Sequence, residues 1–214
     1  MKVIVFGSTG GIGHHVVEQA LAAGHTVTAV ARTPEKLTTR HPNLAVVRGD
    51  VLDAPSFAPG GAIRAAMSGQ QAVISTIGTE SNAPTTLYSD GVRSIASAMQ
   101  AEGVRRLLCI SATGLEPGPL VQRLIAKPIL WHFIGNMYAD LARMEEFVKT
   151  TPLDWTIVRP PRLTDGPRTG RYQVKINRQF RFGGLLLSRA DAADFLVSRL
   201  ADRATFCATV EVAY

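Results

Sequence analysis

Short apolar runs alternate with amphipathic stretches along the chain. Residues 2–6 (KVIVF) form a β-branched apolar run, which is typical of a parallel strand buried on both faces. Residues 12–23 then carry apolar side chains at helical spacing, and Gly24 closes this stretch. The same patterns predict further strands at 26–31, 44–47, 72–77, 104–110, 155–158, 172–176 and 208–212, and helices at 62–68, 85–101, 136–150 and 190–200. This order predicts an α/β fold of the Rossmann type, a doubly wound, mainly parallel sheet with helices on both faces.

The length of the chain, 214 residues, fits one such domain. We therefore predict a single domain over residues 1–214, with small substrate-binding or lid elements around 115–135 and 162–189. The Gly- and Pro-rich pieces at 54–61 and 116–119 are short enough to be loops and not domain linkers.

A glycine-rich segment, GSTGGIG at residues 7–13, lies directly between the first predicted strand and the first predicted helix. Its spacing is GxxGxxG, with an additional glycine at position 11. Gly7 permits the tight turn out of the strand, Gly10 lets the backbone approach a pyrophosphate, and Gly13 lets the helix pack close to the sheet. The N-terminus of the helix then offers free N–H groups to phosphate. The predicted dinucleotide-binding residues here are Gly7, Ser8, Thr9, Gly10, Gly11, Ile12 and Gly13.

The end of the second predicted strand favours NADPH over NADH. Sites specific for NAD place an acidic side chain here to hold the ribose 2′-hydroxyl, whereas this chain has Arg32. A guanidinium can pair with a 2′-phosphate through two hydrogen bonds and stack on adenine. Lys36 adds a second positive charge, and Glu35 is expected to point away. The alternative is an arginine that only covers the protein surface.

Composition and charge exclude several other classes of protein. The hydrophobic fraction of 46% is that of an ordinary globular protein, and the two cysteines, Cys109 and Cys207, form no CxxC motif. We therefore expect no disulfide framework, no metal site and a cytoplasmic location, with Cys109 buried and inert. The net charge of +6 comes from scattered Lys and Arg, so no nucleic-acid partner is expected. No stretch is long enough to span a membrane, and residues 1–7 are too short for a signal-peptide core.

Six segments together carry a family resemblance: GSTGGIG, ARTPEKL, RGDVLD, VISTIGT, GVRRLLCISA and LDWTIVRPPRLTDGPRTGRY. They resemble the atypical short-chain dehydrogenase/reductases. Within that family they are similar to the NAD(P)-binding group that contains flavin reductase/biliverdin reductase B and NmrA-like proteins. The resemblance covers nearly the whole chain and is more specific for fold and cofactor than for substrate.

The resemblance implies further cofactor contacts at the carboxyl ends of the predicted strands, where open α/β sheets bind ligands. Asp50 and Val51 would contact adenine. The segment Ile77, Gly78 and Thr79 would lie beside the ribose and nicotinamide. The segment Ser111, Ala112 and Thr113 would face the reacting ring, and Pro160, Pro161 and Arg162 would lie near the carboxamide.

The usual catalytic pair of this family is missing. Standard short-chain dehydrogenases use a Tyr with a Lys four residues later, which lowers the pKa of the Tyr so that it can protonate a carbonyl oxygen. The candidate here is Tyr138, but residue 142 is alanine, and Arg143 is turned to another side of the helix. This absence counts against the usual reduction of a sugar or steroid carbonyl.

A flavin, quinone or linear tetrapyrrole can be reduced without a strong acid, because its reduced anion is delocalised and takes a proton from water. The first hypothesis is thus an NADPH-dependent oxidoreductase that transfers hydride to a flavin, quinone or similar conjugated small molecule, with Ser111 and Tyr138 as candidate catalytic residues. Both side chains also have structural alternatives, Ser111 as a backbone cap and Tyr138 as a packed ring. The second hypothesis is a non-catalytic NADP(H)-sensing regulator of the NmrA-like kind. An isomerase or epimerase ranks last, because that chemistry normally uses the Tyr–Lys pair.

The segment at 115–135 is the least conventional part of the chain. Its Trp131, His132 and Phe133 are candidates for substrate contacts, although an oligomer contact or core packing would explain them equally well. The chain is expected to be a monomer or a homodimer. Later arginines, Arg168, Arg171 and Arg178, are candidates for contacts with an acidic acceptor.

Overall fold

The computed structural model describes residues 1–79, 81, 83–115, 127–180 and 184–214, and only the backbone of residues 127–134. The strands are β1 (Lys2–Phe6), β2 (Thr26–Ala31), β3 (Leu44–Arg48), β4 (Ala72–Ser75), β5 (Arg106–Ile110), β6 (Asp154–Arg159), β7 (Arg162–Thr164), β8 (Gln173–Ile176), β9 (Leu186–Ser188) and β10 (Ala208–Ala213). The α-helices are α1 (Gly13–Ala22), α2 (Ala54–Phe57), α3 (Ala62–Met67), α4 (Leu87–Ala101), α5 (Lys127–Thr150) and α6 (Arg189–Ser198), and short 3₁₀ turns occur at η1 (Pro34–Lys36) and η3 (Arg203–Thr205).

Eight strands form one sheet in the order β3-β2-β1-β4-β5-β6-β10-β8. Neighbouring strands are parallel except for β8, which runs antiparallel to β10. The chain leaves β1 through α1 toward β2, and after β3 it returns to β4 on the other side of β1. This reversal opens a crevice at the carboxyl ends of β1 and β4, which is where doubly wound sheets bind ligands.

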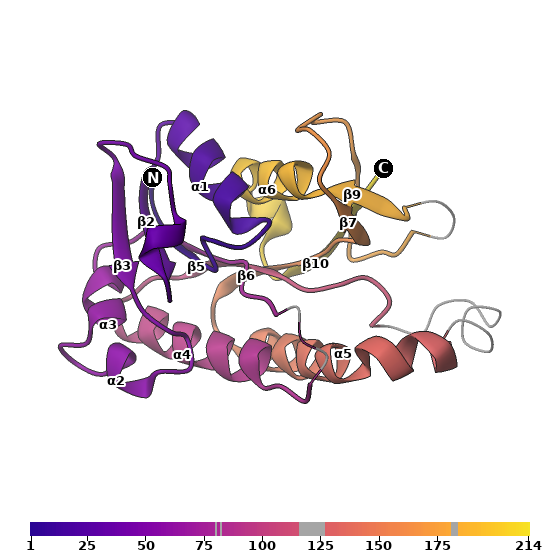
Figure 1. Cartoon of the computed structure of the whole chain (residues 1–214), viewed down its shortest axis with the longest axis horizontal. Helices are drawn as coiled ribbons and strands as arrows, with labels where there is room; N and C mark the ends of the chain where they lie inside the picture. The colour runs from indigo at the N-terminus through magenta and orange to yellow at the C-terminus, as the bar shows by residue number, and fades with distance from the viewer. Residues whose placement is uncertain (80, 82, 116–126, 181–183) are drawn as a thin grey trace.

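Helices cover both faces of the sheet (Figure 1). Helices α1 and α6 pack together on one face, and α3, α4 and α5 lie on the other. Strand β1 shows why both faces close: Val3 and Val5 enter the apolar cluster under α1 and α6, while Ile4 and Phe6 enter the cluster under α4 and α5. All four side chains are fully buried. The predicted fold class and the predicted two-faced burial of this strand are therefore confirmed.

The sequence prediction was wrong or incomplete at four places. The helix expected at 136–150 begins at Lys127, because Pro128 lies in its first turn, where no N–H is needed, and Gly135 is tolerated inside it. Strand β8, expected among the lid elements at 162–189, belongs to the main sheet. Strands β7 and β9, which pair with each other, were not predicted, because three residues are too short to show an alternating pattern. Helix α2 was taken for loop because of its glycine- and proline-rich surroundings.

Candidate cofactor and substrate site

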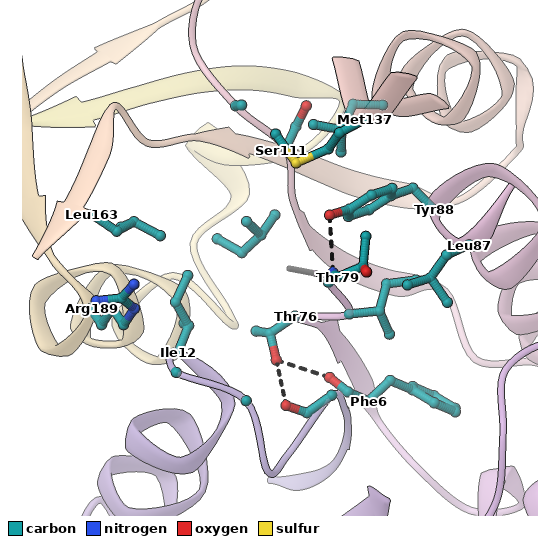
Figure 2. Close-up of a pocket in the computed structure, with 18 of the residues that line it drawn as sticks. Phe6, Ile12, Thr76, Thr79, Leu87, Tyr88, Ser111, Met137, Leu163 and Arg189 are labelled. Atoms are coloured by element: carbon teal, nitrogen blue, oxygen red, sulfur yellow. Dashed lines mark hydrogen bonds between the residues drawn. The ribbon is translucent and has the colours of Figure 1, made fainter. Parts of the chain in front are cut away.

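The glycine loop follows β1 and is shaped by contacts that leave no room for side chains. Gly7 has a φ of +75°, and a Cβ atom there would lie 2.6 Å from the carbonyl group of Thr76. A Cβ atom on Gly13 would lie 2.0 Å from the carbonyl oxygen of Gly7. The Thr76 hydroxyl donates to the carbonyl oxygens of Phe6 at 2.9 Å and Gly7 at 3.3 Å (Figure 2). The end of β4 thus holds the loop, and the loop holds the start of α1.

The N-terminus of α1 is open toward the crevice. Its first turn has no acidic residue, and within the described chain no side chain caps it. Uncapped N–H groups and the positive end of the helix dipole favour a phosphate here. The loop and this helix end together fit the diphosphate of a dinucleotide.

A cavity of about 980 Å³ extends from the glycine loop across the carboxyl ends of the parallel strands. Most of the residues predicted from the sequence line it: Gly7, Thr9, Gly10, Gly11, Ile12, Arg32, Asp50, Val51, Ile77, Gly78, Thr79, Ser111, Ala112, Thr113, Tyr138, Pro160, Pro161 and Arg162. The sheet therefore brings the ends of six strands to one site, and α5 adds Tyr138. Its size is in the range of pockets that hold cofactors and small molecules.

Some predicted residues lie away from the cavity. The Ser8 side chain is fully buried and donates to the carbonyl oxygen of Val30 at 2.9 Å, so this hydroxyl supports the loop from behind. Gly13 acts by its close packing, and Lys36 is exposed in η1 and does not line the cavity. The side chains of Trp131, His132 and Phe133 lie outside the described residues, although their backbone forms part of α5. Among the later arginines, Arg168 forms an ion pair with Asp194 at 2.6 Å and does not line the cavity.

Arg32 lines the cavity, and the nearby carboxylate of Glu35 is paired with another arginine. Glu35 forms an ion pair with Arg48, with 2.5 Å between Oε1 and Nη2. Arg48 also donates to the backbone carbonyl of Arg32 at 3.1 Å, which brings the two arginines together at the ends of β2 and β3. The guanidinium of Arg32 has no hydrogen bond or ion pair within the described chain. It is thus free to meet an anion in the cavity.

Ser111 is tied to a buried ion pair that the sequence analysis did not identify. Its hydroxyl donates to Oε1 of Glu145 at 2.7 Å, and the same carboxylate accepts two hydrogen bonds from Arg159, at 2.8 and 2.5 Å. The side chains of Glu145 and Arg159 are only 3% and 4% exposed. Because the hydrogen of Ser111 is directed at the carboxylate, its Oγ presents lone pairs to the cavity and acts there as an acceptor.

Two tyrosines line the cavity, and the hydroxyl of one donates a hydrogen bond to the backbone while the hydroxyl of the other accepts one. The hydroxyl of Tyr138 donates to the carbonyl oxygen of Thr113 at 3.1 Å. The hydroxyl of Tyr88 instead accepts from the backbone N–H of Thr79 at 3.3 Å, so its own hydrogen remains available on the cavity side (Figure 2). Burial raises the pKa of both phenols, and the Asp140 carboxylate adds to the rise at Tyr88. Both groups are therefore weak acids at neutral pH.

The part of the cavity beside Ser111 and Tyr88 is mainly apolar. Its lining includes Leu87, Met137 and Leu141, which come from α4 and α5, and Leu163 of β7 lines the opposite side near Arg189 and Ile12 (Figure 2). An apolar wall next to a few polar groups suits a flat conjugated ring. Within the described residues no group of three or more His, Cys, Asp or Glu side chains could hold a metal ion, and no helix is long and apolar enough to cross a membrane.

Cys109 lies inside β5 and is fully buried, as the sequence predicted. Burial raises the pKa of its thiol, which keeps it protonated. Arg143 donates to the carbonyl oxygen of Thr85 and to Asp140, whereas the hydroxyl of Tyr138 is bonded to Thr113.

The fold and the glycine loop define a nucleotide-binding protein of the Rossmann type, and comparison with known proteins identifies the family. Residues 7–203 match the NAD(P)H-binding family, and the chain belongs to it. This confirms the resemblance to atypical short-chain dehydrogenase/reductases and the assignment of NAD(P) as the cofactor class.

Two relatives and two solved structures show what the chain is similar to. The chain is 27% identical over 218 residues to the uncharacterized chloroplastic protein At2g34460 of Arabidopsis thaliana, covering 99% of this chain and 76% of the relative. It is 30% identical over 158 residues to a (4-alkanoyl-5-oxo-2,5-dihydrofuran-3-yl)methyl phosphate reductase of Streptomyces griseus, covering 74% of this chain and 46% of the relative.

A Rossmann-fold NAD(P)-binding family protein from Shigella flexneri superimposes with a TM-score of 0.72 at 25% identity, covering 99% and 92% of the two chains. A short-chain dehydrogenase/reductase from Veillonella parvula, solved in complex with NADP, gives a TM-score of 0.79 at 17% identity, covering 100% and 94%. The first supports the family, and the second shows the shared fold.

Proposed function

We propose that this protein is an NADPH-dependent reductase that transfers hydride to a flavin, a quinone or a similar conjugated acceptor. The observation that carries the proposal is the absence of a strong acid at the described part of the site. The hydrogen of Ser111 is directed at Glu145, the hydrogen of Tyr138 is directed at Thr113, and position 142 is alanine. Such a site suits an acceptor whose reduced form needs no strong proton donor.

The preference for NADPH rests on Arg32. Its guanidinium lies at the cavity mouth beside β2, while Arg48 keeps Glu35 from pairing with it. A 2′-phosphate placed there would gain two charge-assisted hydrogen bonds. NADH, which has no phosphate at this position, would not gain them.

The hydride is the chemistry that NADPH supplies: it carries two electrons to the acceptor and leaves NADP⁺, and a second proton comes from water. The residues of the chain would hold the two rings together. Ser111 accepts a hydrogen bond from the bound molecules, and Tyr88 donates one. The apolar side chains of Leu87, Met137 and Leu141 would pack against the acceptor.

The name of the Streptomyces relative supports a conjugated acceptor. A 4-alkanoyl-5-oxo-2,5-dihydrofuran ring contains a carbon–carbon double bond conjugated with carbonyl groups, and that protein is named as its reductase. A conjugated double bond takes hydride at carbon and leaves a delocalised anion. It thus makes the same modest demand on a proton donor as a flavin or a quinone.

The test is anaerobic consumption of NADPH, followed by its absorbance, with FMN, riboflavin, a benzoquinone and biliverdin offered separately. We expect turnover with at least one acceptor, and a much lower rate with NADH at equal concentration. Tight NADPH binding without turnover on any of them would contradict the proposal and favour a non-catalytic NADP(H) sensor. Equal rates with NADH and NADPH would contradict the role of Arg32.

A further inference from the structure

Arg189 reaches the glycine loop from the far end of the sequence. It is the first residue of α6, and its side chain lies over Gly11 beside the cavity, next to Ile12 (Figure 2). A Cβ atom on Gly11 would lie 2.7 Å from both Cδ and Nε of Arg189. The extra glycine of the loop, which the GxxGxxG spacing does not require, is therefore explained by the close approach of this arginine.

The guanidinium of Arg189 is held in place by Asp165. Nη1 donates to Oδ1 of Asp165 at 2.5 Å, and both residues line the cavity. The Arg189 side chain is 31% exposed, and the Asp165 side chain is 89% exposed. An ion pair with so exposed an acid contributes little to stability, so it orients the arginine without binding it tightly. The Nη2 group of Arg189 has no partner within the described chain.

We propose that Arg189 binds the diphosphate of the cofactor and closes over it from the side opposite the backbone amides of the glycine loop. The inference rests on the cofactor of the proposed function, but it concerns the phosphates that NADPH and NADH share. Arg189 and the loop residues Gly10, Gly11 and Ile12 line the same cavity, and a Cβ atom on Gly11 would lie 3.7 Å from Cζ of the guanidinium. A planar guanidinium pairs with phosphate oxygens through parallel charge-assisted hydrogen bonds. Asp165 pre-orients the guanidinium, so less freedom is lost when the cofactor binds.

The first experiment measures the dissociation constants of NADP⁺ and NAD⁺ by calorimetry for the wild-type protein and for Arg189→Ala. We expect both constants to rise by about tenfold, because a charge-assisted contact to a shared group is removed. The ratio of the two constants should not change, whereas Arg32→Ala should change it. If Arg32 does not select NADPH, the ratio of the two constants will stay the same in Arg32→Ala. If Arg189 does not bind the diphosphate, the two constants will not rise together in Arg189→Ala.

The matched control is Arg168→Ala. Arg168 forms an ion pair with Asp194, which lies on α6 as Arg189 does, and Arg168 does not line the cavity. Arg168→Ala should leave both dissociation constants within about twofold of the wild-type values. Its thermal unfolding temperature should change by about as much as that of Arg189→Ala. If Arg189→Ala behaves as Arg168→Ala does, the inference is overturned.

A second variant separates the contact from general damage to the loop. Gly11→Ala should weaken NADP⁺ binding in the wild-type background, because the new methyl group displaces Arg189. In the Arg189→Ala background the same change should cost little, because the atoms nearest to the added methyl group are gone. Equal losses in both backgrounds would place the effect of Gly11 in the loop itself and contradict the proposed contact.

Discussion

The hydroxyl of Ser111, at the cavity wall, donates a 2.7 Å hydrogen bond to the buried carboxylate of Glu145 on α5. That carboxylate is held in turn by Arg159 at the end of β6. The buried ion pair between Glu145 and Arg159 thus sets the direction of the Ser111 hydroxyl in the site. The arrangement makes Ser111 an acceptor toward the bound molecules and separates its role from that of an acid.

Glu145→Gln should lower the free energy of unfolding by about 3 kcal/mol, because it removes the buried negative charge that pairs with the guanidinium of Arg159. Chemical denaturation measures this change. The matched control is Glu146→Gln, since Glu146 is the exposed neighbour on the same helix, and its effect should stay within about 0.5 kcal/mol. Equal losses for the two variants would contradict a stabilising role for the buried ion pair.

Tyr88→Phe should lower kcat/KM by roughly tenfold with little loss of cofactor affinity, because it removes a hydrogen-bond donor that faces the acceptor. Tyr138→Phe should change kcat/KM by less than about threefold, since that hydroxyl is bonded to Thr113, and should cost about 1 kcal/mol in stability. Steady-state kinetics and denaturation of both variants check this contrast. The reverse order of effects on kcat/KM would assign the donor role to Tyr138.

The pH dependence of the reaction follows from the same two phenols. Burial raises the pKa of each, so both remain protonated from about pH 6 to pH 9. Neither phenol should therefore cause a pH-dependent change in the wild-type rate within that range. The pH profiles of Tyr88→Phe and Tyr138→Phe should have the same shape as the wild-type profile. A limb in the pH profile that disappears in either variant would show that the phenol titrates during turnover.

The sequence was sufficient for the parts of the site that lie in one continuous segment. The glycine loop and Arg32 could be predicted because the strand, the turn and the helix that shape them are neighbours along the chain. The cavity residues at strand ends were expected from the family resemblance, and the parallel sheet places those ends together.

The parts that the sequence did not predict depend on packing between distant elements. Arg189 reaches Gly11 only because α6 packs beside α1, and no local pattern indicates that contact. Glu145 left a signal that could have been used, because it lies seven residues after Tyr138 and therefore on the same face of a helix. Tyr88 lies in the first turn of α4, the helix that follows the site strand β4, but no local pattern shows that its side chain enters the cavity.

Arg32→Ser should weaken NADPH binding by about tenfold or more and leave NADH binding nearly unchanged, because only NADPH carries the 2′-phosphate. The matched control is Arg48→Ser. Arg48 is the adjacent arginine, but its charge is already paired with Glu35. Its removal frees Glu35 close to Arg32, so it should weaken NADPH binding less than Arg32→Ser does. Fluorescence titration of both cofactors with the wild type and the two variants gives the six constants, and a larger loss in Arg48→Ser would transfer the role to Arg48.

Acid should destabilise the protein through two histidines. Burial is the main cause that lowers the pKa of His15 and His25, followed by the charge of His14 in the first case and of the N-terminal amine in the second. Each of these histidines binds a proton less readily in the folded state than in the unfolded chain. Its contribution to the free energy of unfolding is therefore fully present above the unfolded pKa of about 6.5, and it is lost as the pH falls toward the lower pKa of the folded state. The free energy of unfolding should therefore fall between about pH 7 and pH 5, and the fall should be smaller in the variant that carries both His15→Gln and His25→Gln. An identical slope in the double variant and the wild type would show that other groups control the acid response.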